Sequence, residues 1–334
     1  MSEQPYTPNK QRYNGGAVPY RYCGCSGLQL PVISLGLWHN FGDVDDPREA
    51  VRMLRFAFDH GITHFDLANN YGTPFGSAER NFGKVMQSDF AAYRDELIIS
   101  TKAGHAMWDG PYGDGGSRKY LMASINQSLK RMQLDYVDIF YSHRYDSNTP
   151  LEETMGALSD IVKQGKALYI GISKYPEDKA KRAIELLREN GTPCLLYQGK
   201  YNILTRKIED SIFPLIQKEG LGFIGYSPLE QGILSDRYLQ GIPQNSRAAL
   251  SHGFLQRSQI TPEIIEKAAL LNAMAKKRGQ TLAQMALSWC LLHPAVTSVI
   301  VGASSLKQLA DNIQSLKNVD FSTEELQQIS AISG

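Results

Sequence analysis

Residues 137–172, VDIFYSHRYDSNTPLEETMGALSDIVKQGKALYIGI, contain the pattern that decides the fold. Two short apolar runs, residues 137–141 and 167–172, flank an amphipathic stretch that begins after Pro150 and ends before Gly165. Proline at a start and glycine past an end are typical of helix termini. The apolar runs show no clean alternation, as expected of strands buried on both faces. The segment therefore predicts a strand, a helix and a second strand parallel to the first.

The same alternation extends over almost the whole chain. The sequence predicts eight buried strands: Ile33–Leu37, His64–Leu67, Leu97–Thr101, Val137–Tyr141, Ala167–Ile172, Leu195–Gln198, Gly222–Tyr226 and Ser298–Val301. It predicts amphipathic helices at Pro47–His60, Arg118–Met132, Leu151–Gln164, Pro176–Asn190, Ile208–Glu219 and Pro262–Arg278. Such alternation favours a parallel sheet, closed or open. An open doubly wound sheet usually carries G-x-G-x-x-G after its first strand, and residues 35–39 contain none. We therefore predict an α/β protein with a (β/α)8 TIM barrel.

The segments outside this alternation complete the predicted domain organisation. Residues 1–17 are expected to form a flexible N-terminal leader, and residues 18–334 a single barrel domain. Residues 20–31, YRYCGCSGLQLP, predict a β-hairpin that turns near residues 24–27. Extra C-terminal helices are expected near Ser305–Leu316 and Thr323–Ile332, capping the barrel or packing on its wall.

Composition and charge restrict the classes of partner. Lys and Arg number 35 against 34 Asp and Glu, a formal net charge of +1, which gives no footprint for nucleic acid or an anionic membrane. No run approaches the ~18 apolar residues of a membrane helix, and residues 1–20 contain no apolar core of a signal peptide. Four cysteines at positions 23, 25, 194 and 290 show no zinc-site spacing. We predict a soluble, cytoplasmic protein.

Four polar residues lie at or just beyond the ends of three consecutive predicted strands. Asp66 ends THFD, Tyr71 follows in the loop NNYG, Lys102 ends ISTK, and His143 ends FYSH. In a barrel the ends of neighbouring strands meet at one rim, where active sites are built. We therefore expect these four side chains to converge.

A cluster of these residue types suits reduction of a carbonyl group by a hydride donor. A Tyr phenol has a pKa of ~10, and a nearby ammonium lowers it. Lys102 is expected to supply that charge, Asp66 to anchor the ammonium, and His143 to orient the carbonyl oxygen. Tyr71 is then the general acid.

Two other interpretations of these residues stay open. Each residue alone is better explained structurally, as a salt bridge, a rim aromatic or a core histidine, but their joint placement favours a site. A metal-dependent hydrolase on the same fold commonly needs an H-x-H pair or several inward carboxylates. The seven histidines contain no such pair, and His64-x-Asp66 comes nearest, so no metal site is predicted.

Three further segments are suited to binding phosphate or substrate. Residues 301–305, VGASS, end a strand and open a helix, where backbone N–H groups and Ser hydroxyls can hold an anion. The long connection at residues 227–260 supplies Arg237 and Arg247, which can clamp phosphates. The Gly-rich loop at residues 104–117 follows the third strand on the same face.

The motifs around the four polar residues resemble those of the aldo-keto reductases, in which Asp, Tyr, Lys and His form a catalytic tetrad. The resemblance rests on GITHFDLANNYG at 61–72, ISTK at 99–102 and FYSHR at 140–144, with GISKY at 171–175, YSPLEQGIL at 226–234, GIPQNSR at 241–247 and VGASSLKQLADN at 301–312. It covers residues 20–330, nearly the whole chain. The stretches at 110–121 and 134–144 resemble the branch that holds bacterial L-glyceraldehyde 3-phosphate reductases and the β subunits of voltage-gated potassium channels.

By this resemblance the tetrad is Asp66, Tyr71, Lys102 and His143, and the cofactor is NADPH/NADP+. The resemblance assigns nicotinamide binding to Ser173, Gln198 and Tyr226, and assigns Trp38 to both cofactor and substrate. It assigns the pyrophosphate to Ser227, Pro228, Leu229, Gly232 and Arg237. It assigns the adenosine end, with its 2′-phosphate, to Arg247, Gly302, Ser304, Gln308, Asp311 and Asn312. Candidates for the substrate pocket, from loop position, are Trp38, Trp108, Tyr112 and Arg144.

Some positions depart from the family pattern. Ala303 and Gln308 stand where many members carry Lys and Arg near the 2′-phosphate, so NADPH preference rests mainly on Arg247 and Ser304, and NADH use stays open. The channel subunits replace the tetrad His by Asn, whereas His143 is present here. The resemblance implies reduction of small aldehydes, L-glyceraldehyde 3-phosphate first and methylglyoxal second, by a homo-oligomer of four or more subunits. The alternative is an NADP(H)-sensing regulatory subunit with little turnover.

Overall fold

The computed structural model describes residues 6–14, 18–244, 246, 248 and 255–334. Eight parallel strands close into a barrel in the order β10-β3-β4-β5-β6-β7-β8-β9. Their bounds are β3 Ile33–Gly36, β4 His64–Asp66, β5 Ile98–Ala103, β6 Val137–Ser142, β7 Ala167–Ser173, β8 Cys194–Lys200, β9 Gly222–Tyr226 and β10 Val296–Val301. The predicted (β/α)8 barrel is confirmed, and each of the eight predicted strands overlaps one barrel strand.

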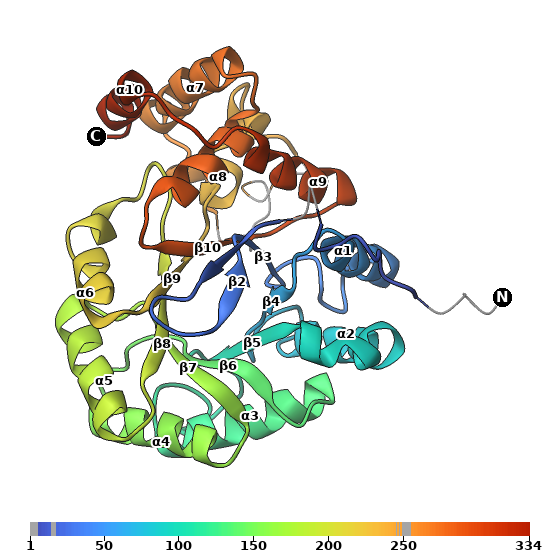
Figure 1. The fold of residues 1–334 in the computed structure, drawn as a ribbon, viewed down its shortest axis with the longest axis vertical. Coiled ribbons are helices and arrows are strands. Elements are labelled where there is room, and N and C mark those ends of the chain that lie inside the picture. Colours follow the sequence, from blue (N-terminus) through green and yellow to red (C-terminus); the bar gives the residue numbers. More distant parts are fainter. Residues whose placement is uncertain (1–5, 15–17, 245, 247, 249–254) are drawn as a thin grey trace.

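Helices follow the strands and form an outer layer around the barrel (Figure 1). They are α1 Pro47–Asp59, α2 Ser77–Val85, α3 Arg118–Met132, α4 Leu151–Lys163, α5 Glu177–Glu189, α6 Ile212–Glu219, α7 Pro262–Lys277, α8 Leu282–Leu292, α9 Leu306–Gln314 and α10 Thr323–Ser333. Several of these helices have an N-cap side chain that accepts a backbone hydrogen bond. The Ser117 hydroxyl accepts from the Tyr120 N–H at the start of α3, and the Thr281 hydroxyl accepts from the Gln284 N–H at the start of α8. No helix in the described part of the chain is long and apolar enough to cross a membrane.

The predicted N-terminal hairpin is present and covers one end of the barrel. Strands β1 Tyr20–Tyr22 and β2 Gln29–Pro31 pair antiparallel and lie across the barrel (Figure 1). The Cys25 N–H donates to the Gly220 carbonyl at 2.8 Å, just before β9 begins. Buried Leu30 packs with Ile139 and other interior side chains of the barrel. The hairpin therefore closes the end opposite the predicted site.

Residues 6–14, part of the predicted leader, contact the barrel wall. The Tyr6 hydroxyl donates to an Asp59 carboxylate oxygen at 2.8 Å, at the end of α1. Arg12 and Tyr13 both bind the Glu96 carboxylate. These contacts involve charged and aromatic side chains, which is why a polar composition alone did not indicate them.

Two helices lie outside the sequence prediction, and each has a physical reason. In α8 nearly every side chain is buried, so the apolar stripe that marks an amphipathic helix is absent. The α2 helix is short, contains Gly83 and runs into a π-helical turn at Met86–Phe90. Gly83 is required there, because a Cβ would lie 2.5 Å from the Arg131 carbonyl oxygen of α3.

Candidate active site

The four predicted tetrad residues come together at one rim of the barrel. Asp66 is the last residue of β4, Lys102 lies near the end of β5, and His143 directly follows β6. Tyr71 lies in the loop after β4, with its ring centre 6.0 Å from that of His143. Parallel pairing of β4 with β5 and of β5 with β6 sets these strand ends side by side.

A buried ion pair forms the base of this cluster. The Lys102 ammonium donates to an Asp66 carboxylate oxygen and to the Leu67 carbonyl, each at 2.6 Å. The other Asp66 oxygen accepts from the Ser100 hydroxyl at 2.7 Å and from the Gln198 amide at 3.2 Å. A buried ion pair is tolerated only when such extra hydrogen bonds satisfy its remaining polar atoms. The positions of Asp66 and Lys102 are therefore strongly determined.

Ser100 connects Asp66 to a chain of hydrogen bonds inside the barrel. A His64 ring nitrogen lies 2.9 Å from the Ser100 hydroxyl, and the other ring nitrogen lies 2.8 Å from the Ser34 hydroxyl. Ser34 in turn lies 2.7 Å from the Ser298 hydroxyl. Burial lowers the pKa of His64 to about 4, so its ring is neutral at pH 7. We call this row, from Ser298 to Asp66, the interior chain.

The Tyr71 phenol is kept in its protonated form. Its hydroxyl lies 3.5 Å from the Lys102 ammonium nitrogen. Burial raises the pKa of Tyr71 well above its ordinary value, and Asp66 and Tyr226 act in the same direction. The sequence predicts that Lys102 lowers this pKa, and the net direction is opposite. The reason is that Asp66 neutralises the ammonium at 2.6 Å while the phenol itself is buried.

His143 is buried beside Tyr71 as a neutral ring. Burial lowers its pKa well below the ordinary value, and the charges of Lys102 and Lys174 lower it further. Its Nδ1 atom is buried and has no hydrogen-bond partner among the described residues. A neutral imidazole can still donate one hydrogen bond, which is what orienting a carbonyl oxygen requires.

The predicted substrate residues occupy different positions at this rim. The Trp38 ring centre lies 6.1 Å from that of Tyr71. Trp108 packs on Tyr120 of α3, with ring centres 5.1 Å apart. Tyr112 is 60% exposed. The structure thus brings Trp38 next to the tetrad and leaves Tyr112 at the surface of its loop.

Arg144, the fourth substrate candidate, holds the Gly-rich loop. Its guanidinium donates to the Gly104 carbonyl at 2.6 Å and to both Asp114 carboxylate oxygens at 2.9 and 3.0 Å. An Arg that is bound to a carboxylate through two oxygens is already well satisfied. Its observed contacts are therefore those of an anchor for residues 104–117.

The predicted nicotinamide residues lie at the ends of β7, β8 and β9. Ser173, the last residue of β7, pairs in register with Gln198 of β8. The Ser173 hydroxyl is fully buried and has no hydrogen-bond partner among the described residues. Tyr226 is the last residue of β9 and is half-buried. An unpaired buried hydroxyl fits a ligand that brings a polar group, such as the carboxamide of a nicotinamide.

The turn after β9 has an unusual backbone. Ser227, Glu230 and Gln231 have positive φ values of 53°, 44° and 55°, and Gly232 follows at 99°. Non-glycine residues occupy this region only when neighbouring contacts impose it. The predicted pyrophosphate residues Pro228 and Leu229 belong to the same turn.

The Glu230 carboxylate supplies the contacts that impose this turn. It accepts from the Lys200 ammonium at 2.6 Å, from the Asn202 amide at 2.7 Å and from the Thr205 hydroxyl at 3.2 Å. The same Asn202 amide donates to the Ser227 carbonyl at 2.9 Å. Glu230 was not predicted as a site residue, although it lies in a motif quoted above.

The segment after β10 has the helix start that the sequence predicts. The Gln308 side-chain oxygen accepts from the Ser304 N–H and from the Ser304 hydroxyl, both at 2.9 Å. Gly302 precedes this start, and Asn312 is buried in α9. Asp311 accepts from the Gln284 amide at 2.6 Å and so ties α9 to α8. Gln308 thus already binds the helix-start donors that the sequence assigns to an anion.

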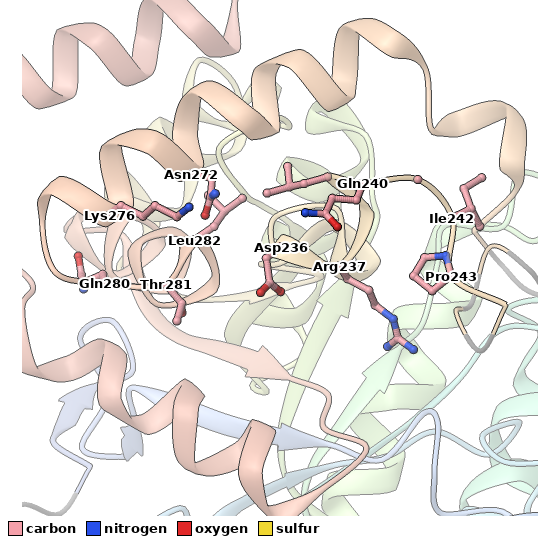
Figure 2. Close-up of a pocket in the computed structure, with 12 residues that line it drawn as sticks. Asp236, Arg237, Gln240, Ile242, Pro243, Asn272, Lys276, Gln280, Thr281 and Leu282 are labelled. Carbon is pink, nitrogen blue, oxygen red and sulfur yellow. The ribbon is translucent and has the colours of Figure 1, made fainter.

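Arg237 lines a cavity of about 660 Å³ between the connection after β9 and helices α7 and α8. Figure 2 shows Lys276 and Asn272 of α7 on one side of it, across from Asp236 and Gln240. The predicted partner of Arg237 in phosphate binding, Arg247, lies outside the described residues.

Three residues near the tetrad were not predicted from the sequence as site residues. They are His64 of the interior chain, His105 beyond β5, and Lys174 directly after β7. Only their positions in the sequence could have indicated them. His64 is two residues before Asp66, and His105 is three residues after Lys102. Lys174 follows Ser173 at a strand end, as His143 follows Ser142.

Comparisons with known proteins identify the family of this chain. The sequence model of the Aldo/keto reductase family matches residues 32–333. The L-glyceraldehyde 3-phosphate reductase of Escherichia coli K12 is 56% identical over 327 residues, covering 96% of this chain and 93% of that protein. A probable voltage-gated potassium channel subunit beta from Oryza sativa subsp. japonica is 35% identical over 315 residues, with 92% and 94% covered. A protein of the same description from Arabidopsis thaliana is 34% identical over 312 residues.

Proposed function

Because the chain belongs to the aldo/keto reductase family and is an oxidoreductase, we propose that it reduces small aldehydes with NADPH and that L-glyceraldehyde 3-phosphate is its substrate. Members of this family use nicotinamide cofactors, generally NADP(H). The substrate proposal is supported by the 56% identity to a reductase of that name. Methylglyoxal is a second candidate of the same chemical class.

The observation that carries the proposal is the buried cluster of Tyr71, Lys102, Asp66 and His143. Burial keeps the Tyr71 phenol protonated, which is the state that can donate a proton to a carbonyl oxygen. The bound cofactor would supply the hydride. Lys102 lies 3.5 Å from the phenol oxygen and stabilises the phenolate that proton donation leaves. Neutral His143 orients the carbonyl oxygen toward the phenol.

The residues at β7–β10 fit a nicotinamide cofactor. Ser173 and Gln198 would hold the carboxamide, and Tyr226 would contact the ring. The turn at residues 227–232 and Arg237 would hold the pyrophosphate, and the segment from Gly302 to Asn312, with Arg247, the adenosine end. Support comes from the unpaired Ser173 hydroxyl and from the imposed backbone of the turn.

Replacing the proposed acid tests the function most directly. We expect Tyr71→Phe to lower kcat for glyceraldehyde 3-phosphate by on the order of 10³, with NADPH binding unchanged in a fluorescence titration. Tyr22→Phe is the matched control, since Tyr22 is 62% exposed on the hairpin at the other end of the barrel. Turnover of Tyr71→Phe within about tenfold of the wild type would contradict the assignment.

The relatives described as potassium channel subunits beta suggest a second function, sensing of NADP(H) with little turnover. Steady-state assays with NADPH or NADH and an aldehyde panel separate the two. Tight cofactor binding with negligible turnover of every aldehyde supports the sensor. The buried Asp66–Lys102 ion pair favours the enzyme over the sensor, because cofactor binding alone does not require a buried ion pair.

A further inference from the structure

Lys174 extends over the same rim from the end of β7. It is not glycine, yet its φ is 59°, in the left-handed region. Its ammonium nitrogen lies 3.4 Å from His105 Nε2 and 5.5 Å from the centre of the Tyr226 ring. The His105 ring in turn lies 4.5 Å from His143. Lys174 is thus connected to the tetrad through His105, whose ring meets the His143 ring edge to face.

The charge of Lys174 has no carboxylate partner within 4.0 Å in the part of the chain that the structure describes. Other basic residues at the ends of the barrel strands differ in this respect. Arg144 is bound by Asp114 at 2.9 Å, and Lys200 is bound by Glu230 at 2.6 Å. Lys174 is therefore a cation, among the described residues of this rim, with which a bound anion can pair at no cost to an existing ion pair.

Electrostatics at this position favour an anion. Partial removal of its ammonium group from water is the main cause that lowers the pKa of Lys174 to about 8, and the charges of Lys102 and Arg144 act in the same direction. The pKa of His105 is lowered to about 4 by burial, Lys174 and Arg144. Burial is the larger cause of both shifts, but cationic neighbours contribute to each, and their positive potential favours an anion here.

Two buried polar atoms without partners lie at the same strand ends. The Ser173 hydroxyl directly precedes Lys174, and His143 Nδ1 belongs to the ring that His105 contacts. Buried polar atoms are nearly always hydrogen-bonded in proteins. Both atoms are therefore available to groups of bound ligands at this rim.

We propose that Lys174, with His105 beside it, binds an anionic group of the aldehyde substrate, and that a phosphate ester is the group it selects. The inference rests on the proposed function, because it places the substrate carbonyl at Tyr71 and His143. The anionic group then lies at Lys174 and His105, on the far side of the His143 ring. A phosphate ester presents three acceptor oxygens and up to two charges. An ammonium with three N–H donors suits that group better than a neutral hydroxyl.

Lys174→Gln tests this in the full-length protein with NADPH. We expect KM for L-glyceraldehyde 3-phosphate to rise about 10- to 100-fold, the range of a lost charge-assisted hydrogen bond, with kcat changed less than about threefold. Unphosphorylated glyceraldehyde should be turned over as by the wild type. In Lys174→Arg, which keeps a positive charge, KM should stay close to the wild-type value. Lys166→Gln, just before the other end of β7, is the matched control.

The pH dependence gives a second readout. Lys174 is charged below its pKa of about 8, so KM for the phosphorylated substrate should rise as pH increases above 8 in the wild type. The groups facing Lys174 are Lys102, His105, His143, Arg144 and Tyr226, from β5, β6, β9 and the loops beyond them. Because Lys174→Gln retains all of them, the rise above pH 8 should disappear in that variant.

Each contrary result has a distinct meaning. If Lys174→Gln lowers kcat/KM equally for glyceraldehyde and for its phosphate, a role in substrate recognition is overturned. A raised Kd for NADPH with unchanged substrate kinetics would overturn it as well. If Lys174→Gln lowers kcat/KM for glyoxylate, a carboxylated aldehyde, as much as for the phosphate ester, the proposed preference for phosphate is wrong. Absence of wild-type glyceraldehyde turnover would count against the proposed function instead. In that case Lys174 can still be tested by calorimetric titration of the NADP+ complex with inorganic phosphate. Equal phosphate binding by the wild type and by Lys174→Gln would refute the subsite.

Discussion

On the β4–β6 side of the rim, Asp66 and Lys102 satisfy each other and are held by the backbone and by Ser100. On the β7–β10 side, the Ser173 hydroxyl has no partner among the described residues, and the turn at residues 227–232 holds three non-glycine residues at positive φ. The Asp66–Lys102 pair is completed by contacts within the protein. On the second side Glu230 holds the turn, but the buried Ser173 hydroxyl is left for a ligand to pair. Proton donation and cofactor binding should therefore respond to mutation separately.

The largest effect is expected from the ion pair. Lys102→Met leaves the Asp66 carboxylate buried without its cation, which should cost about 3–5 kcal/mol of unfolding free energy and lower kcat by on the order of 10³. Adding Asp66→Asn should recover most of the stability, because no buried charge is left, but none of the turnover. Urea unfolding and steady-state kinetics measure both. Lys163→Met, 4.0 Å from Asp160 on the surface of α4, is the control.

If Lys102→Met and the double variant were equally unstable, the two charges would not be paired in solution. If either variant kept kcat near the wild-type value, the β4–β6 side would not be where the proton is handled.

An intermediate effect is expected from His64, beneath the same ion pair. Its pKa is lowered from 6.5 to about 4, so folded His64 stays neutral while an unfolded chain binds the proton. Its contribution to stability is fully present above pH 6.5 and is lost as pH falls toward 4. The loss amounts to about 3 kcal/mol. Urea unfolding of wild type and His64→Gln across this range should show a smaller decline in the variant, and parallel declines would contradict the prediction.

The smallest effect is expected on the cofactor side. Glu230→Ala removes the carboxylate that binds Lys200, Asn202 and Thr205, and so frees the turn at residues 227–232. We expect the Kd for NADPH to rise about tenfold, equivalent to 1.4 kcal/mol, with kcat at saturating NADPH nearly unchanged. Glu263→Ala, an exposed residue paired with Lys267 on α7, is the control. A fall in kcat as large as that of Tyr71→Phe would show that the two sides are not separable.

The parts of this molecule that could be predicted from the sequence are those that topology alone determines. Buried strands are apolar runs, and parallel strands bring Asp66, Lys102 and His143 to one rim whatever the loops do. Lys174 escaped prediction because its contact with His105 depends on a backbone turn with φ 59°, which the residue type does not favour. The direction of the Tyr71 pKa depends on burial against the paired Lys102, a balance that spacing does not reveal.

The interior chain also dictates where individual hydrogen atoms stand. A carboxylate only accepts, so Ser100 must give its hydroxyl hydrogen to Asp66. Ser100 then accepts from His64 Nε2, which leaves His64 Nδ1 to accept from Ser34 and Ser34 to accept from Ser298. His64 is thereby confined to the Nε2–H tautomer, and every dipole in the row points the same way. A negative charge at the rim thus orients a hydroxyl four side chains away, in the wall between β3 and β10.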